Sequence, residues 1–323
     1  MSYAICFNSH GGPEVLEWTH VPVGEPGANQ VRLRHTAIGV NFLDIYERTG
    51  LYATRFPAIP GREAAGVVEV VGSRVKGFVA GDRVAYVGSQ SGAYSEARVM
   101  DVDRLVKLPD GITDQQAAAV LLKGLTAHML LRQTYRVRKG ETLLIHAAAG
   151  GVGLIAVQWA RHLGARVVAI VGSESKRDRV RALGIDHVLL LDEDWVAQIK
   201  SLTRSRGVSV VYDSVGKDTF ERSLDCLRTR GMMVTYGNSS GPVPPIAPLE
   251  LSKRGSLYLT RPTLFNYIAQ RRALDNAARE LFELVQRAVI NVHVGQSYPL
   301  KDAARAQADL ESRRTEGSTV LLP

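Results

Sequence analysis

Cysteine is scarce in this sequence, since Cys6 and Cys226 are the only two among 323 residues. Two thiols cannot build a disulfide framework or a four-cysteine zinc site, and their scarcity is typical of proteins in a reducing compartment. Long hydrophobic runs are also lacking, because no apolar stretch approaches the roughly 20 residues that a membrane-spanning helix needs. The first residues, MSYAICFNSHGGPEV, have neither the basic start nor the apolar core of a signal peptide. We therefore expect a cytoplasmic protein with no membrane partner.

Aromatic residues make up only 7% of the chain, while the formal net charge is +8. This charge permits an anionic partner, but no recognisable nucleic-acid-binding motif accompanies it. The basic residues are dispersed, and the densest groups are Lys176–Arg181, Arg228 with Arg230, Arg271 with Arg272, and Arg313 with Arg314. We expect a phosphorylated cofactor, rather than nucleic acid, to use the positive charge.

The stretch Ile145–Ala160, IHAAAGGVGLIAVQWA, places a glycine-rich turn between an apolar strand and an apolar helix. Gly151, Gly153 and Ala156 match the G-x-G-x-x-G/A spacing of dinucleotide-binding turns. Small residues let the backbone turn sharply and approach a pyrophosphate, and the helix N-terminus offers unpaired N–H groups to its charge. The stretch predicts a site for a nicotinamide dinucleotide.

Hydrophobic patterns divide the chain into two kinds of region. Residues 1–125 contain short, alternating apolar segments separated by Gly, Pro and Asp, which is typical of β-structure. From Ala117 to Pro262 strands and helices alternate, which predicts a doubly wound parallel sheet with ligands at the carboxyl ends of its strands. The expected strands are Thr142–Ala147, Arg166–Val171, His187–Asp192, Val208–Val215, Gly231–Gly237 and Ser256–Thr260, and the expected helices are Gly151–Leu163, Glu174–Leu183, Trp195–Thr203 and Asp218–Leu227.

The end of the second of these strands distinguishes NADH from NADPH. Sites that select NADH place an acidic residue about 20 residues after the glycine turn, where it binds the ribose 2′-hydroxyl. Here Gly172 occupies that place, followed by Ser173, Glu174, Ser175, Lys176 and Arg177. A hydroxyl and two cations suit a 2′-phosphate through charge-assisted hydrogen bonds, whereas Glu174 opposes it. We expect NADPH; the alternative is that the charged run is only a solvated helix face.

Further segments extend this pattern over the whole chain: HGGPEVLE (His10–Glu17), AIGVNFLDIYERTGLY (Ala37–Tyr52), GREAAGVVEVVG (Gly61–Gly72), LLKGLTAHMLL (Leu121–Leu131), VYDSVGKDTFERSLDCL (Val211–Leu227), YGNSSG (Tyr236–Gly241) and GSLYLTRPTL (Gly255–Leu264). With them the chain resembles the medium-chain dehydrogenase/reductase superfamily, and within it the zinc-free NADPH:quinone oxidoreductases related to ζ-crystallin. The resemblance implies an α/β protein. Residues 1–125 and 263–323 would form a GroES-like β-barrel catalytic domain, and residues 126–262 a Rossmann domain with a six-stranded parallel sheet. It also implies an active-site cleft between the two domains.

Two positions bear on a catalytic zinc ion. In the zinc alcohol dehydrogenases of this superfamily, a cysteine lies in the segment matching Gly39–Asp44, and a histidine precedes the glutamate of the segment matching Gly61–Gly66. Here Asn41 and Arg62 stand at those places, and neither an amide nor a guanidinium replaces a thiolate or an imidazole on zinc. We therefore expect no metal, and no ordinary alcohol oxidation, which needs a Lewis acid.

The chemistry that fits is hydride transfer to an acceptor that takes hydride easily, such as a small quinone. The protein then mainly aligns nicotinamide C4 with the acceptor and excludes water. We expect the substrate pocket at Asn41, Asp44, Tyr46, Tyr52 and Thr126, with Asn41 and Tyr46 as hydrogen-bond donors to the quinone oxygen. The alternative for Asp44 is a helix cap, and for Tyr52 a half-buried wall.

The resemblance also implies the contacts of the cofactor. Leu191 replaces a tyrosine that relatives carry near the adenine, which weakens the preference for the phosphate. The implied contacts are Phe42, Asp44, Tyr46 and Met129 at the nicotinamide, Gly151 and Val152 at the pyrophosphate, Gly172, Ser173, Glu174, Ser175 and Lys176 at the 2′-phosphate end, Val215, Asn238 and Ser239 at the nicotinamide ribose, and Thr263, Leu264 and Arg313 on the far side.

The last expected strand, Ser256–Thr260, leaves a sheet edge that a second copy can pair with across a two-fold axis. We therefore expect a homodimer. Two other functions stay open: a zinc-free NADPH-dependent reductase of α,β-unsaturated carbonyls, and a protein that binds RNA on its basic surface in competition with NADPH. Cys226 and the histidines His128, His146 and His162 are expected to be structural, since no ligand-spaced partner accompanies them.

Overall fold

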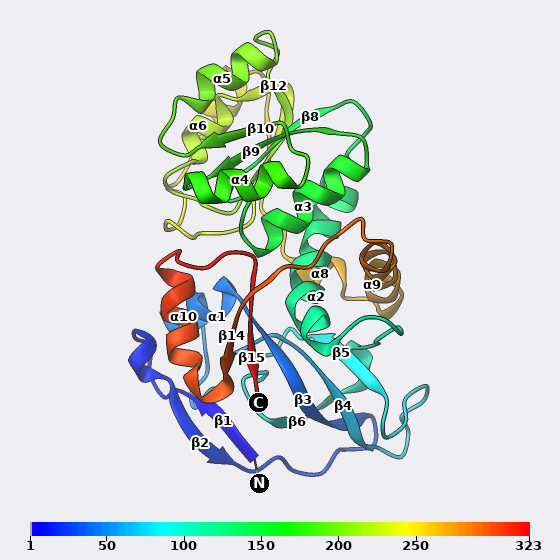
Figure 1. Ribbon diagram of the computed structural model, residues 1–323. Coiled ribbons are helices and arrows are strands. Elements are labelled where there is room, and N and C mark those ends of the chain that lie inside the picture. Colours follow the sequence, from blue (N-terminus) through cyan, green and yellow to red (C-terminus); the bar gives the residue numbers. More distant parts are fainter. Residues whose placement is uncertain (1) are drawn as a thin grey trace. The chain divides into compact units, whose positions relative to one another are not determined.

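The computed structural model describes residues 2–323. The chain folds into two compact units, whose elements are labelled in Figure 1. The first comprises Met1–Lys123, Ile268–Arg287 and Val292–Pro323, and the second comprises Gly124–Tyr267 and Ala288–Asn291. Each unit has a hydrophobic core of its own.

β-Strands dominate the first unit. A two-stranded antiparallel pair, β1 (Ser2–Cys6) with β2 (Glu17–Val21), accompanies a larger sheet of order β14-β15-β3-β4-β5-β7, in which β6 also pairs with β3. The strands of the larger sheet are β3 (Gln30–Val40), β4 (Glu63–Val71), β5 (Arg83–Val87), β6 (Ala97–Asp101), β7 (Leu105–Lys107), β14 (Val294–Pro299) and β15 (Ser318–Leu322). The helices are α1 (Phe42–Arg48), α9 (Arg271–Gln286) and α10 (Ala303–Glu311), and α2 (Asp114–His128) begins in this unit.

The strand β3 shows how the sequence builds this sheet. Val31, Leu33 and His35 are buried, whereas Arg34, between the last two, is exposed. This alternation places one face of the strand in the core. The register with β4 shifts between Arg32 and Leu33, and a further shift lies farther along the strand. Such irregularities bend a sheet and let it curl toward a barrel.

The second unit is built on a parallel sheet of order β10-β9-β8-β11-β12-β13. The order reverses beside β8, as in a doubly wound dinucleotide-binding fold, and the predicted six-stranded parallel sheet is confirmed in the described chain. Its elements are β8 (Thr142–Ile145), α3 (Gly151–His162), β9 (Arg166–Val171), α4 (Glu174–Ala182), β10 (His187–Leu190), α5 (Trp195–Leu202), β11 (Val208–Asp213), α6 (Phe220–Leu224), β12 (Leu227–Thr235), α7 (Pro248–Lys253), β13 (Tyr258–Thr260) and α8 (Leu264–Tyr267).

Some expected boundaries were wrong, each for a local backbone reason. β8 ends before Ala147, because that residue has a φ of 49° and the chain turns there. β12 begins at Leu227 instead of Gly231, since its early part already pairs with β11, and the helix before it is correspondingly shorter than expected. β13 begins at Tyr258 instead of Ser256, whose φ of 57° interrupts the strand.

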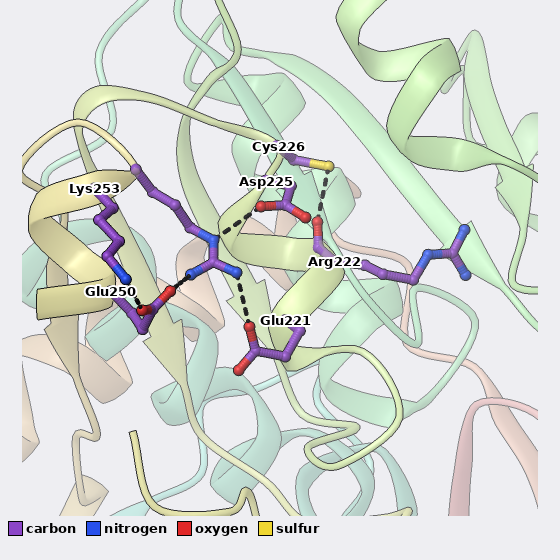
Figure 2. Close-up of polar contacts among 7 residues, drawn as sticks. Glu221, Arg222, Asp225, Cys226, Glu250 and Lys253 are labelled. Carbon is purple, nitrogen blue, oxygen red and sulfur yellow. Dashed lines mark hydrogen bonds and ion pairs between the residues drawn. The ribbon is translucent and has the colours of Figure 1, made fainter. Parts of the chain in front are cut away.

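One arginine ties α7 to α6. The guanidinium of Arg254 lies 3.0 Å from Glu221, 2.9 Å from Asp225 and 2.7 Å from Glu250, and Lys253 also binds Glu250 at 2.9 Å (Figure 2). Single exposed ion pairs contribute little, but a cation shared among three carboxylates forms a network. This network fixes the segment that leads into β13.

Candidate functional site

The turn between β8 and α3 leaves no room for a side chain at Gly153. A Cβ there would lie 2.7 Å from the Cα of Ala148 and closer still to the carbonyl oxygen of Ala147, so the position requires glycine. α3 begins at Gly151, and its N-cap, Gly150, has no side chain to bond the first helical N–H groups. Those N–H groups, together with the partial positive charge of the helix end, are suited to bind a phosphate.

A buried polar network supports the loops that follow β8 and β11. The Oδ1 atom of Asp213 accepts hydrogen bonds from the N–H of Val215 at 2.7 Å and of Gly216 at 3.1 Å. The Ser223 hydroxyl donates to Oδ2 of Asp213 at 3.3 Å, and its oxygen lies 2.8 Å from Nε2 of His146. Because the hydroxyl gives its proton to Asp213, Nε2 of His146 donates to Ser223. Burial lowers the pKa of His146, so its ring stays neutral.

The loops that follow β11 and β12 are bonded to each other. The N–H of Ser239 donates to the carbonyl of Ser214 at 3.2 Å, and the N–H of Ser240 donates to the carbonyl of Val215 at 2.8 Å. The structure thus brings Val215, Asn238 and Ser239 together at the carboxyl end of the sheet, where such folds bind ligands.

The segment after β9 is open and lacks an acid at its first position. Gly172 is exposed, and no atom lies within 4 Å of a Cβ built there, so space alone would admit an acidic side chain. Ser173 is the N-cap of α4 and accepts a hydrogen bond from the N–H of Lys176 at 3.4 Å. Glu174 is paired with Arg177 at 3.2 Å. This pairing offsets the negative charge that opposes a phosphate here.

Asp44 closes the first turn of α1. Its Oδ2 atom accepts hydrogen bonds from the N–H of Asn41 at 2.9 Å and from the hydroxyl of Tyr94 at 2.9 Å. The residue is completely buried, and burial, with the nearby Glu47, raises its pKa to about 7. These contacts describe a residue that positions Asn41 and the helix start, and direct contact of Asp44 with a substrate or cofactor stays a prediction.

Three aromatic rings at and after α1 are in successive contact. The ring centroids of Phe42 and Tyr46 are 6.1 Å apart, and those of Tyr46 and Tyr52 are 5.5 Å apart at an interplanar angle of 71°. Tyr52 remains 37% exposed. Such rings offer a flat molecule an apolar surface with a hydroxyl at the edge.

Two charged residues that sequence reasoning did not single out lie beside Asn41. Oε1 of Glu63 accepts hydrogen bonds from Nδ2 of Asn41 and from Nζ of Lys123, each at 2.8 Å. Glu63 and Lys123 are both buried. The signal was an acid at the start of the apolar segment of β4 and a single lysine in the apolar segment of α2, since buried charges are almost always paired.

No group of three or more His, Cys, Asp and Glu side chains in residues 2–323 is arranged to hold a metal ion. At the two positions compared above with zinc ligands, Asn41 bonds to Glu63, and Nε of Arg62 donates to Glu47 at 2.8 Å. Both side chains are therefore engaged with carboxylates. In the described chain, no helix is both long and apolar enough to span a bilayer.

The remaining predicted residues are distributed over both units. Thr126 and Met129 belong to the second unit, where Met129 is buried at the start of a π-helical turn. Leu264 begins α8 directly after Thr263, which is exposed. Arg313 belongs to the first unit and is exposed, with a φ of 61°.

Cys226 lies between α6 and β12, and its Sγ lies 3.4 Å from the carbonyl oxygen of Arg222 (Figure 2). Burial raises the pKa of this thiol to about 12. At neutral pH the group is therefore a protonated thiol, which is a poor nucleophile and metal ligand.

Two family models match the chain. Residues 27–110 match the alcohol dehydrogenase GroES-like domain, and residues 151–287 match the zinc-binding dehydrogenase domain. The quinone oxidoreductase of Pseudomonas aeruginosa is 51% identical over 325 residues, which cover 100% of both chains. This chain belongs to the quinone oxidoreductase family of the medium-chain dehydrogenase/reductase superfamily.

Solved structures of this family agree with that placement. The crystal structure of Escherichia coli quinone oxidoreductase complexed with NADPH superposes with a TM-score of 0.97 at 49% identity, covering 99% of this chain and 100% of that chain. A 2-haloacrylate reductase from Burkholderia sp. is 45% identical over 331 residues, covering 100% of this chain and 99% of its own. The family resemblance and the fold class predicted from the sequence are confirmed.

Proposed function

We propose that this member of the quinone oxidoreductase family transfers hydride from NADPH to small quinones without a metal ion. The observation that carries the proposal is the arrangement at the carboxyl end of the parallel sheet, where such folds bind ligands. There the turn requires glycine at 153, and Gly172 stands where NADH-selecting sites have an acid. The NADPH complex of the relative from Escherichia coli supports the same cofactor.

The residues present fit NADPH. A Cβ at Gly153 would collide with the backbone of Ala147 and Ala148, so glycine lets the start of α3 lie close to the end of β8, and the first N–H groups of α3 are suited to a pyrophosphate. Ser173 and Lys176 would bind the 2′-phosphate through charge-assisted hydrogen bonds. When bound, NADPH supplies a hydride from C4 of its nicotinamide. The other proposed contacts are those named above: Phe42, Tyr46, Met129, Gly151, Val152, Gly172, Glu174, Ser175, Val215, Asn238, Ser239, Thr263, Leu264 and Arg313.

The protein's own part is to bind and orient the acceptor and to exclude water. Tyr52 would stack on the acceptor ring. Tyr46, whose ring lies at 71° to that of Tyr52, would contact the edge of the acceptor, and the Tyr46 hydroxyl would donate to the acceptor oxygen. The sequence predicted that Asn41 donates a hydrogen bond to the quinone oxygen. We propose a different role, because Nδ2 of Asn41 donates to the carboxylate of Glu63, which can only accept. The amide of Asn41 would form a fixed polar wall, with Thr126 as a further wall of the pocket.

A quinone suits a site of this composition. Hydride addition makes its ring aromatic, and its oxygens take a proton from water or a weak acid, so no Lewis acid has to polarise them. The amide of Asn41 and the guanidinium of Arg62 are not zinc ligands. The donor set at these positions thus supports the zinc-independent reaction.

The second candidate is reduction of an α,β-unsaturated carbonyl compound. The relative named 2-haloacrylate reductase, at 45% identity over the full chain, favours it. That reaction uses the same hydride geometry but needs a proton delivered to carbon, so it requires a positioned acid that quinone reduction does not need.

We also propose that the active form is a cytoplasmic homodimer. β13 is the outermost strand of the parallel sheet in the described chain, and Tyr258 on it is 57% exposed. Pairing of β13 with its copy would continue the sheet and cover that edge.

A comparison of acceptors tests the proposal. Purified protein is mixed with NADPH and either 1,4-benzoquinone or 2-chloroacrylate, and absorbance is followed at 340 nm. We expect rapid oxidation with the quinone and slow oxidation with the haloacrylate. The reverse order would support the second candidate. Tight NADPH binding without turnover of either acceptor would contradict both.

A further inference from the structure

The carboxylate of Glu63 is the most completely enclosed charge beside the proposed substrate pocket. The residue has no exposed surface. Its Oε1 accepts from Nδ2 of Asn41 and Nζ of Lys123, each at 2.8 Å, and its Oε2 accepts from the N–H of Leu122 at 2.7 Å. All three partners donate, so the network is satisfied only when Glu63 is ionised.

The backbone around this carboxylate is shaped to admit it. A Cβ on Gly39 would lie 2.5 Å from the carboxyl carbon of Glu63 and closer still to the carbonyl oxygen of Ala118. β3 therefore needs glycine at this position for Glu63 to reach α2. The carboxylate of Glu63 is thus packed against the backbone of β3 at Gly39 and bonded to α2 at Leu122 and Lys123.

The ion pair determines which way the amide of Asn41 faces. An ionised carboxylate can only accept, so Nδ2 of Asn41 points toward Glu63. A protonated Glu63 could donate instead, and the amide could then turn its oxygen inward. Lys123, which is only 5% exposed, supplies the positive charge that balances the buried carboxylate of Glu63.

The charge balance in this region makes the lysine necessary. Asp44 is buried on α1 near both Glu47 and Glu63. The other cations of this region are engaged elsewhere, Arg62 with Glu47 and the buried Arg48 with Glu311. Without Lys123 the region would carry an unpaired buried carboxylate where hydride transfer adds negative charge to the acceptor. Like charges close together in a dry site disfavour each other strongly.

We propose that Lys123 is a positioning residue of this site, whose ammonium group pairs with the buried carboxylate of Glu63 and thereby fixes the amide of Asn41 at the substrate pocket. The proposal rests on the proposed function, because that function places Asn41 at the pocket. Lys123 acts through Glu63 and needs no contact with the substrate.

Four variants test this role: Lys123→Met, Glu63→Gln, their double combination, and Lys107→Met as the matched control. Lys107 also forms an ion pair at 2.9 Å, with Asp82, but its side chain is 54% exposed. We expect Lys123→Met to lower kcat for 1,4-benzoquinone about tenfold or more, with KM for NADPH changed less than twofold. Lys107→Met should leave both unchanged.

The double variant separates positioning from stability. Removing both charges restores neutrality, so the melting temperature lost in Lys123→Met should largely return, because neutral replacements of buried ion pairs are tolerated. The kcat should stay low, because the amide introduced by Glu63→Gln can either accept from or donate to Asn41 and no longer fixes the direction of the Asn41 amide. A kcat within twofold of the wild type in Lys123→Met, or recovery of kcat together with stability in the double variant, would overturn the proposal.

A second readout is independent of turnover. Lys123→Met leaves a buried carboxylate without its cation, so its melting temperature should be lower than that of the double variant, in which both charges are absent. Equal melting temperatures of these two variants would contradict the role of Lys123, whereas a wild-type protein inactive with quinones would contradict the proposed function alone.

Discussion

Replacing Gly172 by aspartate should turn the cofactor preference from NADPH toward NADH. No atom lies within 4 Å of a Cβ at this position, and the residue is exposed, so the substitution has no steric cost. Its effect is therefore electrostatic. The new carboxylate would stand where NADH-selecting sites of this fold bind the ribose 2′-hydroxyl.

The expected changes in KM come from two interactions of the new carboxylate, an unfavourable one with the 2′-phosphate of NADPH and a favourable one with the 2′-hydroxyl of NADH. Two unit charges about 5 Å apart repel by about 3 kcal/mol at an effective dielectric constant of 20, and solvent and salt at this exposed position reduce that to about 1.5 kcal/mol. The KM for NADPH should therefore rise roughly tenfold. A hydrogen bond from the 2′-hydroxyl to the carboxylate contributes about 1.5 kcal/mol, so KM for NADH should fall roughly tenfold.

The assay is steady-state oxidation of each cofactor at 340 nm with a saturating quinone. Gly172→Asn is the matched control, because it has the same size without the charge and should shift the NADPH-to-NADH ratio of kcat/KM much less. Neither variant should change the melting temperature. If Gly172→Asp leaves this ratio within twofold of the wild type, the 2′-phosphate does not bind beside Gly172, and the assignment of Ser173 and Lys176 fails with it.

Three further predictions concern other parts of the fold. Gly153→Ala should weaken NADPH binding at least tenfold in a fluorescence titration, because its Cβ would lie 2.7 Å from Ala148 and displace the first turn of α3, and unchanged affinity would contradict the role of that helix start in binding the pyrophosphate. Asp44, whose pKa is raised from 3.8 to about 7, is most stabilising below its unfolded pKa. The melting temperature of the wild type relative to Asp44→Asn should thus fall from pH 4 to pH 7 and level off above, and a flat difference would refute this. Cys226, with its pKa raised to about 12, should react with an aromatic disulfide reagent only after unfolding, and fast reaction in the native protein would show that it is accessible.

Local patterns predicted the cofactor unit well because its signals are local. The strand, the glycine turn and the helix around Gly153 are consecutive in sequence, and the alternation of apolar strands and helices follows from burial on both faces of the sheet. The errors were at element ends. Ala147 and Ser256 end or delay strands because each has a positive φ, which a pattern of apolar residues does not encode.

The contacts that position the site were harder to predict, because they join residues far apart in sequence. Lys123 reaches Glu63 across 60 positions, and His146 reaches Ser223 across 77. The sequence marked these residues only as polar groups inside apolar segments, without naming their partners. Asp44 illustrates the same limit, since spacing alone could not distinguish a pocket residue from a helix cap.

Turnover by metal-depleted protein tests the central claim most directly. Protein dialysed against a chelator is assayed at 340 nm with 1,4-benzoquinone and either NADPH or NADH. The account predicts undiminished activity after chelation and a higher kcat/KM with NADPH. Loss of activity that zinc restores, or a preference for NADH, would contradict it.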